Sequence, residues 1–303
     1  MNEDVKDCKI LLNGKTAISP SHSVKRPAPP EDIRLWRDRD IGHDTELLRA
    51  VFYSHRYPAH SHDEFVIAAF ERGAQRHSIS RKTGVAVPGT VMIIPPGEVH
   101  TGEAERNIGM WAYRAFYPAA GVLERVAEEL FDTHVTGLDF GCRHLRKDAA
   151  LARHLTRAHQ VIETARDPLE KQTALIDAMA ALIDRYGQLT KSGRIKAQPG
   201  ADVRRALELI HACFDQRLTI DQVADAAGLS EYHFMRSFHK KTGMTVHAYI
   251  NQTRLRAAKE HLANGMTATQ TAVSVGFCDQ SHLTHCFRAS FGVTPGQYAQ
   301  ACR

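Results

Sequence analysis

The fold is decided by a pattern that occurs twice near the end of the chain, first in Thr219–Tyr249 (TIDQVADAAGLSEYHFMRSFHKKTGMTVHAY) and again in Thr267–Tyr298 (TATQTAVSVGFCDQSHLTHCFRASFGVTPGQY). Each copy has Thr-x-x-Gln, Ala-x-x-x-Gly, a polar residue, two apolar residues four apart, and Gly-x-Thr-x-x-x-Tyr. The offset is 48 residues as far as the first glycine and 49 beyond it, so the second copy has one more residue in its turn. A single match would be weak evidence, whereas two copies in register are specific.

Each copy predicts a short helix, a tight turn and a second helix. The Thr-x-x-Gln pairs fit the capping box, in which both side chains satisfy amides at a helix start. Glycine reaches positive φ at little cost, which suits the turn. Ser230 and Asp279 are good N-caps for the second helices. The apolar residues four apart give each second helix one buried stripe. This is a helix-turn-helix arrangement, whose second helix can lie in the DNA major groove.

The second copy resembles the C-terminal signature of the AraC/XylS-type transcription regulators. The likeness runs through Ala272–Leu283 and continues at Phe287-Arg288, Phe291-Gly292 and Thr294-Pro295. It covers roughly the last hundred residues, while the N-terminal part matches more loosely. The resemblance implies DNA binding, an N-terminal effector domain and activation through RNA polymerase, although the sequence does not exclude repression.

Residues near the start of each second helix that avoid its apolar stripe are predicted to face DNA. By this reasoning, and by what the resemblance implies for matching positions, the DNA-binding residues are Tyr232, Met235, Arg236, Gln280, Ser281, His282, Thr284 and His285. Lys240, at the end of the first reading helix, is predicted to add salt-dependent affinity for DNA. Arg236 suits a bidentate contact with guanine and Gln280 one with adenine. A phosphate contact for Arg236, packing for Tyr232 and a solvated helix end for Lys240 are the alternatives. His285 departs from the family, where arginine is common, so we expect looser reading by the second copy.

A helix of about 248–264 is predicted between the copies, with Ile250, Leu255, Ala258 and Leu262 on its buried side. Its length of roughly 25 Å could hold the two reading helices near one DNA turn apart. We expect its three cations to be solvated or near phosphates: Arg254, Arg256 and Lys259.

Composition is that of a globular protein with room for two domains: 303 residues, 43% hydrophobic and 24% charged. The net charge of +5 decides little, so DNA binding must rest on local placement. The six scattered cysteines, without a Cys-x-x-Cys pair, suit reduced thiols in a cytoplasm. We expect a cytoplasmic protein with no membrane span or signal peptide, since the chain has no run of 18 apolar residues and no apolar core at its start.

The chain divides into four predicted parts, a two-domain α+β organisation. Residues 1–30 read as a disordered tail, 31–187 as a cupin-like effector-binding and dimerisation domain, 188–200 as a linker, and 201–303 as the double helix-turn-helix domain. Short apolar runs between Leu47 and Pro118 indicate β-strands, and the cupin resemblance described below implies that they form a β-barrel. Helices follow at 120–131, about 148–165, and from Pro168, capped by Asp167. The apolar stripes of the last two helices either cap the barrel or form a homodimer contact. The resemblance favours a homodimer.

Histidines in the predicted barrel resemble the two motifs of a cupin. His60, His62 and Glu64 form one group and His100 belongs to the other, but the glutamate usual a few residues after the second histidine is missing. We favour a metal-free pocket for a polar or anionic effector, formed by these four residues. A metal-binding sensor and purely structural histidines are the alternatives.

We therefore expect an effector-responsive DNA-binding transcription regulator with no catalytic residues, no cofactor and no resident metal. Effector binding would shift the balance between domain arrangements, because a ligand acts only through unequal affinity for two states. The rival from another class is a cupin metalloenzyme or metal sensor with a DNA-binding appendage.

Overall fold

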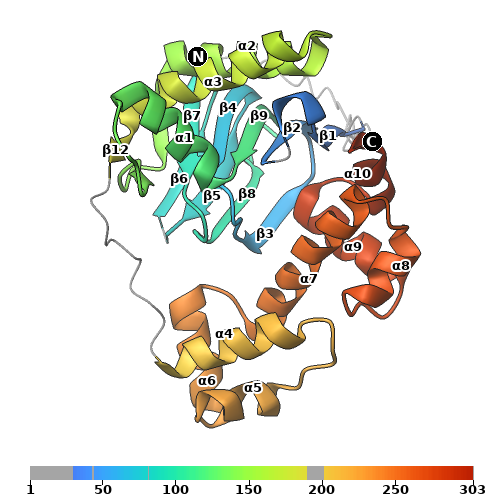
Figure 1. The fold of residues 1–303 in the computed structure, drawn as a ribbon. Helices are drawn as coiled ribbons and strands as arrows, with labels where there is room; N and C mark the ends of the chain where they lie inside the picture. The colour runs from blue at the N-terminus through green and yellow to red at the C-terminus, as the bar shows by residue number, and fades with distance from the viewer. Residues whose placement is uncertain (1–29, 43, 81, 190–200, 303) are drawn as a thin grey trace, which may run out of the picture.

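The computed structural model describes residues 30–42, 44–80, 82–189 and 201–302, and divides them into a β-rich N-terminal domain and a helical C-terminal domain (Figure 1). The predicted tail, except residue 30, and residues 190–200 of the predicted linker lie outside the described residues. Gln188 and Leu189, which the sequence placed in the linker, form strand β12. Among the described helices, none is both long and apolar enough to cross a bilayer.

Two antiparallel sheets face one another in the N-terminal domain. The larger has the order β1-β2-β9-β4-β7-β11 and the smaller β3-β8-β5-β6. Their strands are β1 (Asp32–Arg37), β2 (Thr45–Phe52), β3 (Arg56–His60), β4 (Val66–Gly73), β5 (Gln75–Ile79), β6 (Lys82–Ala86), β7 (Thr90–Ile94), β8 (His100–Ala104), β9 (Trp111–Pro118) and β11 (Leu145–Lys147). A short pair joins β10 (Leu138–Asp139) to β12 (Gln188–Leu189). A 3-10 turn, η1 (Arg39–Ile41), follows β1.

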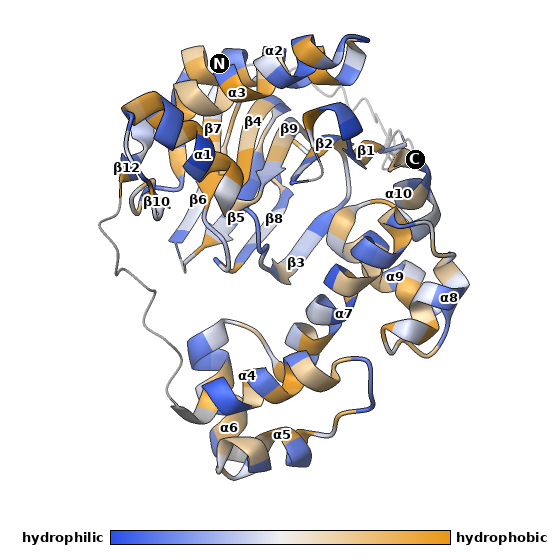
Figure 2. Ribbon diagram, in the orientation of Figure 1, coloured by the Kyte–Doolittle hydropathy of each residue, from blue (hydrophilic) through white to orange (hydrophobic). Residues whose placement is uncertain are grey.

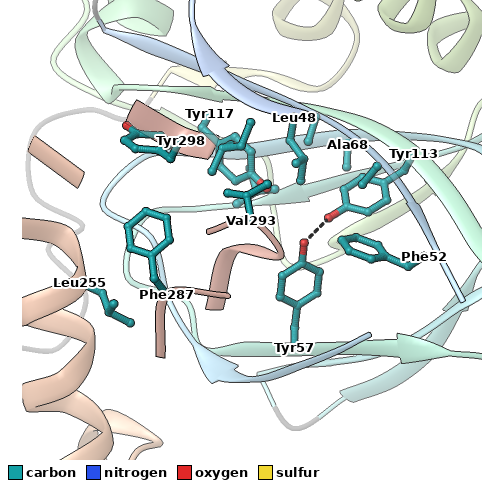
Figure 3. Packing of buried hydrophobic residues seen from close by; sticks show 14 of the residues in the cluster. Leu48, Phe52, Tyr57, Ala68, Tyr113, Tyr117, Leu255, Phe287, Val293 and Tyr298 are labelled. Carbon is teal, nitrogen blue, oxygen red and sulfur yellow. Dashed lines mark hydrogen bonds between the residues drawn. The ribbon is translucent and has the colours of Figure 1, made fainter. Parts of the chain in front are cut away.

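The alternation of side chains along β4 explains how one sheet serves two cores. Val66, Ala68 and Phe70 point between the sheets, whereas Ile67 and Ala69 point to the outer face. The first set is buried between the two sheets, and the second set is buried because helices cover the outer face. Between the sheets, the hydroxyls of Tyr57 on β3 and Tyr113 on β9 are 3.1 Å apart and link the two sheets (Figure 3).

The covering helices are α1 (Ala120–Phe131), α2 (Ala149–Thr164) and α3 (Pro168–Tyr186), which confirms the three predicted segments. Asp148 and Asp167 cap α2 and α3 with their side chains. The apolar stripe of α2 is buried against the larger sheet, and that of α3 is buried in the same core, where α3 packs on α2 and α1. Figure 2 shows both helices lying on the same side of this sheet. Capping the sheet therefore accounts for the stripes, although Leu169 and Ile176 of α3 stay exposed.

The C-terminal domain consists of two units joined by a long helix. Its helices are α4 (Ala201–Cys213), α5 (Ile220–Ala227), α6 (Glu231–Thr242), α7 (Val246–Ala263), α8 (Ala268–Ser274), α9 (Gln280–Phe291) and α10 (Pro295–Ala301). Both predicted capping boxes form, at Thr219 and at Thr267. A third, unpredicted box forms at Thr294, at the start of α10.

Both predicted N-cap positions, Ser230 and Asp279, are confirmed, but only one of them makes the side-chain bond. Ser230 precedes α6 with extended backbone, but its side chain makes no capping bond. Its hydroxyl lies 2.9 Å from Nδ1 of His233 instead. Asp279 does cap α9, accepting a hydrogen bond from the amide of His282. The shorter serine side chain has found a side-chain partner one turn on, so the cap is the weaker of the two.

The two units differ in what encloses them. We call α4–α6 with the start of α7 the first unit, and α8–α10 with the end of α7 the second unit. The first unit has a core of its own around Phe234 and Phe238. The core of the second unit, including Phe287 and Tyr298, is continuous with the space between the two sheets (Figure 3). The second unit is thus packed on the β domain, and the first unit projects from it (Figure 1).

Candidate DNA interface and effector site

Helix α6 presents the first group of predicted DNA contacts on its outer face. Phe234 and Phe238 are fully buried on the opposite side. Met235 is 45% exposed, and Arg236 and Lys240 are exposed as well. Tyr232 lies in the first turn of α6, but its side chain is outside the described part of the chain. The helix therefore offers Met235, Arg236 and Lys240 along one accessible face, as a groove-reading helix requires.

Helix α9 presents the second group differently. Gln280, Ser281 and His285 are exposed, and Thr284 is half-buried with its hydroxyl donating to the carbonyl of Gln280. The predicted contact His282 packs edge-on against Phe277, with ring centroids 5.1 Å apart. A cavity of about 530 Å³ lies over the helix, lined by His55, Gln280, Ser281, Thr284, His285, Arg288 and Ala289. His55 belongs to the β domain, which therefore borders the reading face of α9.

A buried ionic cluster holds the two domains together. Glu46 on β2 is 5% exposed and pairs with the ammonium group of Lys259 on α7. The hydroxyl of Tyr298 on α10 donates to the same carboxylate at 2.8 Å, and Arg37 Nε lies 3.6 Å from it. Burial, and then the charge of Glu46, raise the pKa of Tyr298 far above its usual value, so the hydroxyl keeps its proton. We call these four residues the Glu46 cluster.

The prediction that the cations of α7 are solvated or near phosphates is wrong. Lys259 is 7% exposed and lies in the Glu46 cluster. Arg256 is 2.9 Å from Asp63 and also donates to Ser61, while Arg254 donates to the carbonyls of Phe214 and Gln216. Arg256 and Lys259 bind groups of the β domain because α7 runs along the domain junction, whereas Arg254 binds the loop between α4 and α5 in its own domain. Lys259 was detectable, since it follows Leu255 by four residues and thus continues the buried stripe.

The junction also contains a cavity of about 480 Å³. Its walls come from the loop after β3 and from α7 and α9, and they include His60, His62, Glu64, Gln252, Arg256, Lys259 and Phe291. A volume of this size is in the range of cavities that hold organic ligands. The space between the two sheets is much smaller, about 40 Å³, because tyrosines and phenylalanines fill it.

The structure brings three of the four predicted effector residues together. His60, His62 and His100 each offer a ring nitrogen, and the three nitrogens lie within 4.8 Å of one another. Glu64 is outside this cluster and lines the junction cavity. Burial lowers the pKa of His60 to about 4. Burial, followed by the neighbouring histidines, holds the pKa of His62 well below its usual range, and burial does the same for His100. Burial therefore favours the neutral form of all three imidazoles.

Comparison with known proteins assigns both domains. Residues 42–179 match the model described as the AraC-like ligand binding domain, and residues 223–301 match a helix-turn-helix domain. The Tn10 TetD protein of Escherichia coli is 36% identical over 97 residues, which are 32% of this chain and 70% of TetD. YbfI of Bacillus subtilis, an uncharacterized HTH-type transcriptional regulator, is 26% identical over 238 residues, covering 78% of this chain and 85% of YbfI.

Two further similarities extend over nearly the whole chain. The transcriptional activator RhaS of Enterobacter sp. is 23% identical over 267 residues, covering 86% of this chain and 93% of RhaS. The crystal structure of an apo ToxT variant from Vibrio cholerae matches with a TM-score of 0.51 at 10% identity, covering 85% of this chain and 98% of ToxT. At that identity the structural likeness concerns the fold alone.

Proposed function

Since this chain belongs to the AraC family of transcription regulators, we propose that it reads DNA with α6 and α9 and that a small molecule at the domain junction controls the second of these helices. The observation that carries the proposal is the contrast between the two reading faces. That of α6 projects from the molecule, whereas that of α9 borders the β domain at His55. A ligand that favours one domain arrangement would change how freely α9 reaches a major groove.

The junction cavity supports the choice of effector. Its lining combines neutral imidazoles and the amide of Gln252 with both cations and carboxylates, among them Arg256, Lys259, Asp63, Glu64 and Glu260. Such groups bind a polar molecule, or an anionic one that displaces Asp63 from Arg256, through directed hydrogen bonds. A ligand there would touch the β domain, α7 and α9 at once, so it would bind unequally to open and closed arrangements.

The remaining expectations belong to the same proposal. We infer a cytoplasmic regulator that acts on RNA polymerase as an activator, without catalysing a reaction itself. A homodimer would use the exposed apolar residues of α3, Leu169 and Ile176. AdaA of Bacillus subtilis, 34% identical over 94 residues, is named both an activator and a DNA repair enzyme, but the match covers only 44% of that protein.

A random-oligonucleotide selection with the full chain at moderate salt tests the proposal. We expect strong enrichment of a short motif read by α6 and weaker enrichment of a second motif, read by α9, whose centre lies about 10 bp away, one helical turn of DNA. The matched control is the double variant Arg236→Ala with Gln280→Ala, which should lose the enrichment while keeping its fold. Absence of any enriched motif with the wild-type chain would refute the proposal.

A further inference from the structure

We propose that His60, His62 and His100 bind one divalent transition-metal ion, of the zinc, cobalt or nickel class. The inference rests on the proposed function for its purpose, because it names what part of the effector site holds. It differs from the metal-free pocket that the sequence favoured. It also needs no glutamate, since three imidazoles with an open position are a sufficient donor set for zinc.

The fold places the three side chains in one spot. His60 ends β3 and His100 begins β8, and the two residues are directly opposite in the antiparallel pairing of these strands. Directly opposite residues hold their side chains on the same face of a sheet. His62 follows His60 by two residues, the spacing that returns a side chain to the same face of an extended segment. The rings of His60 and His100 have centroids 4.3 Å apart, and the His62 ring lies 4.9 Å from the first and 5.2 Å from the second.

Backbone carbonyls orient two of the three rings as metal ligands require. Nδ1 of His60 lies 2.7 Å from the carbonyl oxygen of Pro58, and Nδ1 of His100 lies 2.9 Å from that of Glu98. A carbonyl only accepts, so Nδ1 carries the proton and Nε2 carries the lone pair of the neutral ring. Histidines that bind metals commonly donate their other N–H to a carbonyl or carboxylate in this way. Histidines with a purely structural role need no such shared orientation.

The size of the site suits an ion better than an organic ligand. Bonds of ~2.0–2.1 Å in a tetrahedral site place nitrogens ~3.3 Å apart. The present limit of 4.8 Å therefore requires each ring to move inward by under about 1 Å, which small rotations about χ1 and χ2 supply. The adjoining cavity of about 40 Å³ leaves room for the ion with one or two waters, given roughly 10–15 Å³ for each water.

The chemistry of the surroundings narrows the metal class. Neutral imidazoles suit zinc, nickel, cobalt and copper, whereas magnesium and calcium need oxygen ligands. The carboxylate that lines the same cavity, Glu46, is already held by Lys259 and Tyr298. Three neutral ligands leave the ion with its full charge, so the open position favours a hydroxide or a small anion. His60 and His62 also line the junction cavity, which gives such an anion a route to the ion.

Titration of the untagged full chain with Co²⁺, after treatment with a chelator, tests the proposal. We expect one equivalent to bind with visible absorption bands of a four- or five-coordinate nitrogen site, and Zn²⁺ to displace it. Thiolate charge-transfer bands in the near ultraviolet would instead identify cysteine ligands and overturn the assignment. His62→Gln and His100→Gln should each weaken binding at least about 100-fold, the upper end of what loss of a supporting partner costs. His134→Gln, which removes an exposed histidine of the β domain, should leave binding unchanged.

Two further measurements keep the test decisive. Circular dichroism of the metal-free variants shows whether they fold; if they do not, pulsed electron paramagnetic resonance of the Cu²⁺-loaded wild type counts the bound imidazoles, and fewer than three would overturn the proposal. Retained binding in both variants, or no stoichiometric binding in the wild type, would do the same. The DNA selection described above is independent of these readouts, so loss of metal binding with intact DNA binding would refute only the metal site.

Discussion

The two helix-turn-helix units carry the same sequence pattern, yet one stands on its own core and the other shares the core of the β domain. Matched positions show how this arises. The hydroxyl oxygen of Tyr249 in the first unit lies 3.0 Å from Nε2 of His211 in the same unit. Tyr298, its counterpart, donates across the domain boundary to Glu46. A shared pattern thus fixes the shape of each unit, and a few outward-facing partners decide what each unit binds.

The glycines that follow α6 and α9 also show that the second unit packs more closely on the β domain than the first. A Cβ on Gly292 would come within 3.1–3.2 Å of Phe52 and Ile33, so the turn after α9 sits tightly on the β domain. A Cβ on Gly243, after α6, would meet Val99 at 3.4 Å, an ordinary contact. Both glycines have positive φ, near 75°, which other residues rarely adopt. The close approach of the backbone is therefore a property of the second unit.

Breaking the Glu46 cluster should release the second unit from the β domain, so that both units become equally independent of that domain. Lys259→Met keeps the length of the side chain but removes the charge that pairs with Glu46. Removing one partner of a buried ion pair typically costs about 3–5 kcal/mol, and we expect the lower end because Tyr298 and Arg37 still contact Glu46. Hydrogen exchange of α9 and α10 should accelerate strongly, while that of α5 and α6 should stay as in the wild type.

Lys240→Met serves as the control, because Lys240 is exposed on α6 and outside the cluster. Unchanged protection of α10 in Lys259→Met would mean that apolar packing alone holds the second unit. The Glu46 cluster would then have no part in the docking of the domains.

Acid should destabilise the β domain, on which the second unit is packed, more than it destabilises the first unit. His159 on α2 is 0% exposed, and burial, reinforced by Arg114, lowers its pKa to about 3. The folded state therefore keeps this ring neutral, while the unfolded chain takes up a proton below about pH 6.5. Stability is lost as the pH falls from about 6.5 towards 3, by about 2 kcal/mol at pH 5.

Urea unfolding followed by tryptophan fluorescence measures this loss, since Trp36 and Trp111 are the tryptophans of the chain and both lie in the β domain. The free energy of unfolding of the wild type should fall by about 2 kcal/mol more between pH 7 and pH 5 than that of His159→Gln. The glutamine can still accept a hydrogen bond from Arg114 but does not titrate. Equal losses in the two proteins would show that His159 is not the responsible group.

Local features of the fold were predictable from sequence because they depend on neighbours in the chain. The capping pairs at Thr219 and Thr267, the helix from Pro168 and the buried stripe of α7 all follow from spacing. Partners far apart in sequence were not predictable, and Glu46 was missed for that reason. The spacing of Lys259 from Leu255 indicated a buried position, but the burial was misjudged because lysine is rarely buried without a partner and the sequence does not identify Glu46 as that partner.

The histidine cluster lies between these cases. The pair at His60 and His62 is visible in the sequence, and its likeness to a cupin motif also indicated His100. The likeness did not extend to Glu64, which faces the junction cavity. The sequence cannot give the register that sets His60 opposite His100, nor the small volume between the sheets. These two facts distinguish an ion from an organic effector.

Single substitutions in the reading helices should reveal which unit dominates DNA binding. Loss of a bidentate base contact costs about 1–3 kcal/mol. We expect Arg236→Ala to incur this cost in the effector-free protein, because α6 is accessible. Gln280→Ala should cost little there and more in the Lys259→Met background, where α9 is released. Fluorescence anisotropy with the selected duplex measures both; equal costs of the two substitutions in both backgrounds would contradict the asymmetry.

The smallest effect concerns His285, which is exposed on α9 beside Gln280 and Ser281. A neutral imidazole binds a phosphate or a base edge more weakly than a guanidinium, so His285→Arg should tighten DNA binding by up to about 1 kcal/mol. The added charge should also steepen the logarithmic dependence of affinity on salt by about one. The gain should be larger in the Lys259→Met background, since docking limits the approach of α9. If affinity, salt dependence and sequence preference were all unchanged in both backgrounds, His285 would not face DNA, and the second unit would read its site through Gln280 and Ser281.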